Sequence, residues 1–109
     1  MTLAWLRRNF APNAAVKVRR VRGYIKKRGC FGECFMYVDD EYITRCNIYI
    51  ERNMSLSMQR ETLLHEWAHS LTLFGNDTDE HGDEWALAYG RIYRLFVEWN
   101  YGRPRSTEE

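Results

Sequence analysis

Apolar side chains recur every three or four residues in three stretches of this chain, a spacing typical of amphipathic helices. The first stretch covers residues 2–11, and Pro12 is expected to end it. The second surrounds residues 63–74, in a predicted helix of about 18 residues with Ser55 or Ser57 as its N-cap and Gly75 as its stop. The third begins near Asp83 and continues to about residue 100 before Gly102 and Pro104.

Between the first two helical patterns lie three runs with the composition of β-strands. Residues 16–21 and 34–38 are expected to pair as an antiparallel hairpin, joined by a mobile, solvated loop over residues 23–32. A third strand is predicted over residues 42–50, after an acidic turn. The order predicts an α+β fold with an N-terminal helix, a three-stranded antiparallel or mixed sheet, and two further helices. We expect one domain over residues 1–102 and a short frayed tail over residues 103–109.

The second helical stretch contains two histidines four residues apart, with a carboxylate directly after the first. Positions i and i+4 share one helix face, so His65 and His69 can both bind one metal ion. Glu66 lies roughly 100° around the helix from His65, where it can act on a water beside the metal. This pattern predicts a zinc site, one Zn²⁺ per chain, with Glu66 as general base.

A catalytic zinc ion needs a third protein ligand and keeps a fourth position for water. His81 is the only other histidine in the chain, twelve residues after His69, and it is the preferred third ligand. Glu84 on the following helix is the alternative, as in a thermolysin-like site. Tyr89 and Arg91, near the start of that helix, are candidates to stabilise an oxyanion.

The two motifs, His65-Glu66-Trp67-Ala68-His69 and His81-Gly82-Asp83-Glu84-Trp85, resemble those of the SprT-like metallopeptidases, the family of the Spartan proteases. The resemblance implies a compact zincin-like metalloprotease in which His65, His69 and His81 bind zinc and Glu66 is the catalytic base. The loop between the motifs is short, and the family's four-cysteine zinc ribbon and DNA-binding tail are not found, which predicts a minimal stand-alone catalytic domain. In related zinc peptidases an edge strand beside the metal helix aligns the substrate, and residues 42–50 are the candidate strand.

Charge is distributed unevenly along the chain, because residues 1–32 contain nine lysines or arginines and no acidic residue. Lys26, Lys27 and Arg28 are therefore candidates to bind DNA non-specifically, although the same pattern fits an ordinary solvated face. Some members of the SprT-like family cleave proteins crosslinked to DNA, so the resemblance extends the expected substrates to DNA-associated proteins.

The expected function is a zinc-dependent metalloendopeptidase acting on a protein or peptide substrate. The alternative from another class is a non-catalytic, zinc-stabilised nucleic-acid-binding module, and hydrolysis of a non-peptide amide is a third possibility. Three cysteines without a Cys-x-x-Cys spacing favour a reducing compartment, so we expect a cytoplasmic protein. We expect a monomer. We also expect no membrane association, because no stretch approaches the roughly 18 apolar residues that span a bilayer.

Overall fold

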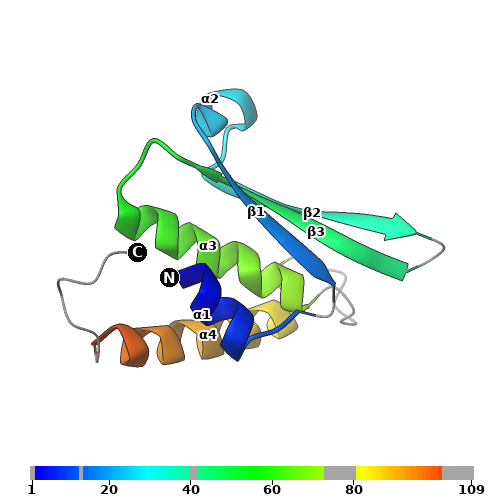
Figure 1. The fold of residues 1–109 in the computed structure, drawn as a ribbon, viewed down its shortest axis with the longest axis vertical. Helices are drawn as coiled ribbons and strands as arrows, with labels where there is room; N and C mark the ends of the chain where they lie inside the picture. The colour runs from blue at the N-terminus through cyan, green and yellow to red at the C-terminus, as the bar shows by residue number, and fades with distance from the viewer. Residues whose placement is uncertain (1, 13, 40–41, 73–80, 102–109) are drawn as a thin grey trace.

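The computed structural model describes residues 2–12, 14–39, 42–72 and 81–101 of the chain. It contains four helices and three strands in these residues (Figure 1): α1 (Thr2–Asn9), β1 (Ala15–Val21), α2 (Tyr24–Arg28), β2 (Gly32–Asp39), β3 (Tyr42–Glu51), α3 (Leu56–Leu71) and α4 (Asp83–Tyr101). The predicted α+β class is confirmed, and the sheet is mixed. The predicted tail, residues 103–109, lies outside the described residues.

The sheet has the strand order β1-β3-β2, with β1 parallel and β2 antiparallel to β3. The predicted hairpin between residues 16–21 and 34–38 is therefore wrong, because β3 lies between those two strands. Cys46, Ile48 and Ile50 of β3 are all 0% exposed. The apolar face of β3 is buried because this strand lies at the centre of the sheet. The proposed role of residues 42–50 as a substrate-aligning edge is also wrong, and β2 is the edge strand that contacts α3.

Residues 23–32 were expected to form a mobile loop, and part of this segment instead forms the short helix α2. Gly23 precedes this helix and Gly29 follows it. Their φ angles of 78° and 76° are left-handed, a conformation that residues with a Cβ rarely adopt. The buried carboxylate of Glu51 accepts hydrogen bonds from the amides of Gly23 (3.0 Å), Ile25 (2.8 Å) and Asn53 (2.8 Å). These bonds lower the pKa of Glu51 and attach α2 to the end of β3.

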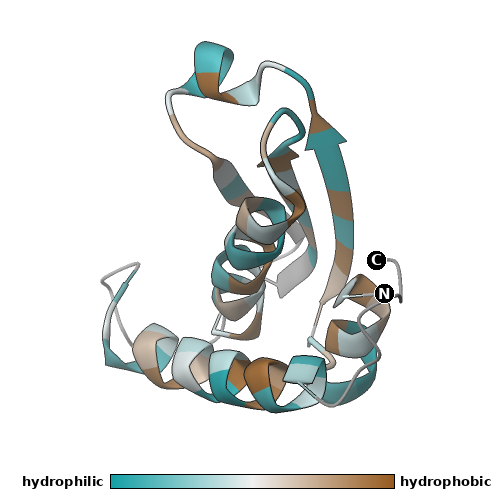
Figure 2. Cartoon of the chain, turned by 90° about the vertical axis from the view of Figure 1, so that its left-hand side faces the viewer, coloured by the Kyte–Doolittle hydropathy of each residue, from teal (hydrophilic) through white to brown (hydrophobic). Residues whose placement is uncertain are grey.

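Helices α1, α3 and α4 lie on one side of the sheet, and α2 lies at one end of it (Figure 1). The core forms between the sheet and these helices, and its centre includes Leu6, Ile48, Leu63, Leu64, Trp67 and Ile92. The apolar stripe predicted for α4 packs against this core, and hydrophobic positions along α4 alternate with hydrophilic ones (Figure 2). The Trp67 indole also donates a hydrogen bond of 2.9 Å to the Phe10 carbonyl, which attaches the end of α1 to α3.

Helix α3 begins as predicted, with the Ser55 hydroxyl accepting a hydrogen bond of 3.1 Å from the Met58 amide. It ends at Leu71 after 16 residues, earlier than the stop predicted at Gly75, which lies outside the described residues. Within the described ranges, no helix is both long and apolar enough to span a bilayer.

Candidate metal centre and active site

Three histidines converge at the C-terminal end of α3. His65 and His69 project from the same face of α3, and His81 lies two residues before α4. The Nε2 atom of His81 is 3.2 Å from Nε2 of His69 and 3.3 Å from Nε2 of His65. Nitrogen ligands bound about 2.0–2.1 Å from one tetrahedral ion would lie about 3.3 Å apart. The three histidines can therefore hold a single metal ion.

The third position in this group belongs to His81. Among the described His, Cys, Asp and Glu residues, only His65, His69 and His81 form a group whose ligand atoms lie within 4.8 Å of one another. The alternative ligand, Glu84, is not part of this group. No fourth protein ligand joins the three imidazoles in the described part of the chain, so one position of a tetrahedral ion would be left for a non-protein ligand.

The environment of His69 favours its neutral form. Burial, followed by the nearby His65 and His81 rings, lowers the pKa of His69 to about 4. A neutral imidazole has a free lone pair with which it can bind a metal ion. His81 is exposed, whereas His65 and His69 are half-buried.

Glu66 lies beside this centre with 7% of its surface exposed. Its Oε2 atom is 3.9 Å from Nε2 of His65. Both residues line a pocket of about 310 Å³ whose wall is formed by Phe31, Gly32, Glu61, Thr62, His65, Glu66 and Tyr89. Glu66 therefore lines an open space next to the three histidines.

Trp85 has a role in this site that the sequence did not reveal. Its ring centroid lies 4.8 Å from His65, 5.4 Å from His69 and 4.8 Å from His81, and it stacks on His69 with an interplanar angle of 28°. Its indole nitrogen also donates a 3.3 Å hydrogen bond to the His65 carbonyl. Trp85 thus packs against all three imidazoles and restricts their orientations. The apolar stripe of α4 predicted that Trp85 packs inward, but not that it contacts the histidines.

Comparison with known proteins identifies the family of this chain. Residues 3–105 match the SprT-like family model. The chain belongs to the SprT-like family. It is also 35% identical over 57 residues to Protein SprT of Pseudomonas putida (strain GB-1), an alignment that covers 50% of this chain. The chain spans 35% of the length of that relative. No solved structure matches the chain.

The two oxyanion candidates of this SprT-like chain occupy different environments. Tyr89 lines the pocket, and its ring centroid lies 5.8 Å from that of His65. Burial, and then the negative charge of Glu61, raises the pKa of Tyr89, so its hydroxyl remains a hydrogen-bond donor at neutral pH. Arg91 is exposed and is not among the residues that line the pocket. Tyr89 is therefore the candidate that the fold brings to the site.

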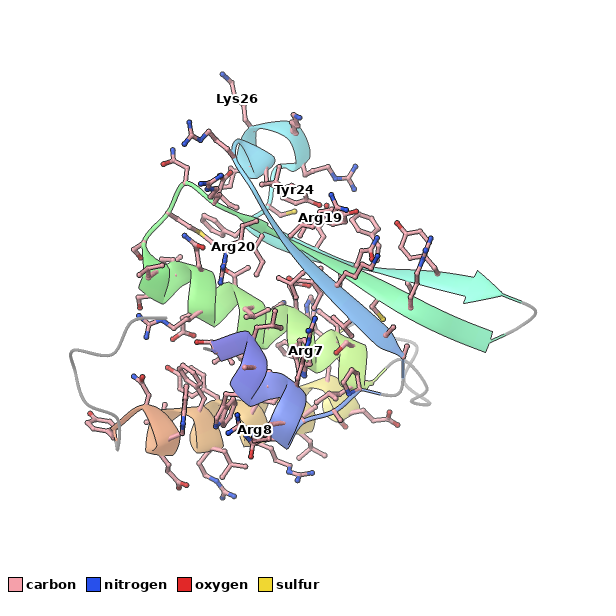
Figure 3. All side chains as sticks on the ribbon, in the orientation of Figure 1. Arg7, Arg8, Arg19, Arg20, Tyr24 and Lys26 are labelled. Atoms are coloured by element: carbon pink, nitrogen blue, oxygen red, sulfur yellow. The ribbon has the colours of Figure 1, made fainter. Side chains whose placement is uncertain are left out.

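The candidate DNA-binding residues of this SprT-like chain lie on α2, which ends three residues before Phe31 of the pocket beside His65 and Glu66. Lys26 and Lys27 are exposed, and Lys26 points away from the rest of the fold (Figure 3). Arg28 is exposed but already paired, with Nε 2.8 Å from Oε1 and Nη2 3.2 Å from Oε2 of Glu33. DNA binding by this segment stays a prediction, and within it Lys26 and Lys27 carry the charges that are not offset by Glu33.

Proposed function

We propose that this chain is a zinc-dependent endopeptidase that hydrolyses peptide bonds at the His65, His69 and His81 centre. The observation that carries the proposal is the placement of Glu66 beside three converging imidazoles and facing a pocket. Three imidazole nitrogens are a ligand set that zinc accepts readily. When bound, zinc supplies a Lewis acid for the scissile carbonyl and lowers the pKa of the attacking water.

In this mechanism the protein's own groups position the reactants and move the proton. The Glu66 carboxylate accepts a proton from the attacking water and then delivers it to the nitrogen of the leaving amine. Trp85 keeps the imidazoles in place through its ring contacts and its hydrogen bond to the His65 carbonyl. The Tyr89 hydroxyl is the candidate donor to the oxyanion that develops on the attacked carbonyl.

A substrate backbone can extend the sheet beside the metal centre. Within the described residues β2 is an edge strand that pairs with β3, and an extended peptide could add along its other edge. Gly32 begins this strand and also lines the pocket that contains His65 and Glu66. A peptide added along β2 would therefore pass the proposed catalytic base. Proteins associated with DNA are one proposed class of substrate.

A purely structural zinc site is less consistent with the same geometry. Structural zinc ions are almost always bound by four protein ligands, whereas the described residues bring only three together here. A non-catalytic site also has no use for a carboxylate next to the ligands and facing a pocket. These two features favour the peptidase over the zinc-stabilised nucleic-acid-binding module.

The proposal is tested with Glu66→Gln and with alanine variants of the ligands. Glu66→Gln should retain about one zinc per chain and the wild-type circular dichroism spectrum, yet lose nearly all cleavage of an unstructured protein, because an amide cannot take up the proton. His81→Ala should weaken zinc binding strongly, while Glu84→Ala should not. Equal cleavage by wild type and Glu66→Gln would contradict the proposal, as would zinc loss from Glu84→Ala but not from His81→Ala.

A further inference from the structure

The pocket beside the metal centre contains an acidic residue that the hydrolysis proposed above does not use. Glu61 lies on α3 four residues before His65, so both side chains project from the same helix face. At a rise of about 1.5 Å per residue, the two positions are about 6 Å apart along the helix axis. Glu61 thus lies within the length of one long side chain from the centre at which a peptide bond would be cut.

The wall of this pocket favours a positively charged group. Its residues include two carboxylates, Glu61 and Glu66, and neither a lysine nor an arginine. Glu66 is assigned to proton transfer, which leaves Glu61 to interact with a bound ligand. The Tyr93 hydroxyl donates a hydrogen bond of 3.2 Å to Oε1 of Glu61, and the Tyr89 side chain also interacts with this carboxylate. The charge of Glu61 also raises the pKa of Tyr93, so this hydroxyl remains a donor at neutral pH.

The same wall offers aromatic surface to a long aliphatic stem. Phe31 contributes a ring that is 50% exposed, immediately before β2, and Tyr89 contributes a second ring from α4. Lysine and arginine side chains cover apolar surface with their methylene groups, and their cationic ends interact favourably with aromatic faces. At about 310 Å³ the pocket is at the lower end of the range for ligand sites, so it suits one side chain and not a large ligand.

We propose that this pocket is a specificity subsite that binds a lysine or arginine side chain of the substrate, close to the scissile bond. Glu61 accepts hydrogen bonds from the cationic end, and Phe31 and Tyr89 contact the stem. This inference rests on the proposed peptidase function and adds a substrate preference to it. The preference follows from charge complementarity between the pocket wall and a basic side chain.

The first experiment measures cleavage. Zinc-loaded wild-type protein is incubated with peptides randomised around a central segment, and mass spectrometry identifies the bonds cut. Lysine and arginine should be enriched at one fixed position relative to the cut. Quenched fluorescent peptides with lysine, glutamine or norleucine at that position should then differ in kcat/KM, with lysine favoured on the order of tenfold, as expected for a charge-assisted hydrogen bond.

Variants then test whether Glu61 is the cause of the preference. Glu61→Gln should equalise lysine and glutamine, and Glu61→Lys should favour glutamate at the same position. Tyr93→Phe removes a hydroxyl that donates to Glu61 and should reduce the preference. Glu98→Gln, which removes an exposed carboxylate of α4 outside the pocket, is the matched control and should leave the preference unchanged. Circular dichroism and zinc content should match wild type in every variant.

A binding measurement separates this inference from the proposed function. Zinc-loaded Glu66→Gln protein is titrated into fluorescein-labelled peptides that carry lysine or norleucine, and fluorescence anisotropy reports affinity. The lysine peptide should bind on the order of tenfold more tightly, and adding Glu61→Gln should remove the difference. If this difference is found but no wild-type cleavage occurs, the subsite stands and the peptidase proposal fails.

The opposite results overturn the subsite. Cleavage without any preference for lysine or arginine, or a preference that persists in Glu61→Gln, would leave the peptidase proposal standing and show that Glu61 does not select the substrate. Absence of cleavage together with equal or undetectable binding of both peptides would reject both.

Discussion

The contact between β2 and α3 beside the metal centre leaves no room for a side chain at Gly32. A Cβ atom added there would lie 2.6 Å from Cγ2 of Thr62, 3.0 Å from the Tyr49 carbonyl oxygen and 3.5 Å from Cγ of Glu66. Thr62 and Glu66 are both on α3, so an alanine at this position must push β2 and α3 apart. We expect Gly32→Ala to destabilise the fold and to displace the proposed catalytic base.

The size of the effect follows from these distances. Forcing an extra methyl group into a packed contact typically costs about 1–3 kcal/mol. Replacing glycine with alanine offsets about 0.4–1 kcal/mol of this by restricting the unfolded chain. We therefore expect Gly32→Ala to lower the free energy of unfolding by about 1–2 kcal/mol. A displacement of the base approaching 1 Å would lower peptide cleavage by up to about 100-fold.

A second substitution tests whether Thr62 is the cause. Thr62→Ser removes Cγ2 but keeps the hydroxyl, which donates a hydrogen bond of 2.8 Å to the Met58 carbonyl. In a double-mutant cycle followed by urea denaturation, it should recover on the order of 1 kcal/mol in the Gly32→Ala background. Gly90→Ala is the matched control, because a Cβ there meets no atom within 4 Å, and it should gain about 0.5–1 kcal/mol. Wild-type stability in Gly32→Ala, or strict additivity in the cycle, would refute the steric argument.

Three further predictions concern other parts of the molecule. The pKa of Glu51 is lowered in the fold, so its charge stabilises the protein above the unfolded pKa of 4.5, and this stabilisation is lost as the pH falls further. Urea denaturation from pH 6 to pH 3 should therefore show a smaller loss of unfolding free energy in Glu51→Gln than in wild type. Equal losses would contradict this. Trp85→Ala should weaken zinc binding about 10–100-fold in competition with a chelating dye, and unchanged affinity would exclude its orienting role. If DNA binds α2, the double variant Lys26→Ala and Lys27→Ala should flatten the slope of log affinity against log salt by up to about two units. Arg28→Ala should flatten it by less. Absence of DNA binding at low salt in an anisotropy titration would contradict this prediction.

The helices α3 and α4, which position the three candidate ligands, could be predicted because their signals are local. The spacing of His65 and His69 places both on one face of any α-helix, independently of what surrounds that helix. The N-cap at Ser55 and the apolar stripe of α4 are also local signals, because each is set by residues close together in the sequence. The third histidine could be proposed by counting the histidines in the chain, but its approach to the other two depends on how α3 and α4 pack.

The order of the strands could not be predicted, because it depends on contacts between distant residues. Two consecutive strand patterns are most simply read as a hairpin. Here the segment between β1 and β2 contains α2, and Glu51 at the far end of β3 accepts the amides that hold α2 in place. A carboxylate that binds amides 26 and 28 residues away leaves no local pattern in the sequence. The crossover that leaves room for β3 between the other two strands is therefore visible only in the fold.

The walls of the pocket show the same limit at the level of function. Phe31 precedes β2, Glu61 belongs to α3 and Tyr89 belongs to α4, so their approach depends on three contacts between elements. In the sequence, Glu61 is an ordinary charged residue in the first half of a helix, and it is distinguished only by its position one turn before His65. The spacing of the proposed metal ligands and the proposed base indicates a reaction type, whereas any preference among substrates depends on which side chains the fold places around them. Substrate selection in this chain is therefore best tested at Glu61, where one charge can be removed without altering a proposed metal ligand or the proposed base.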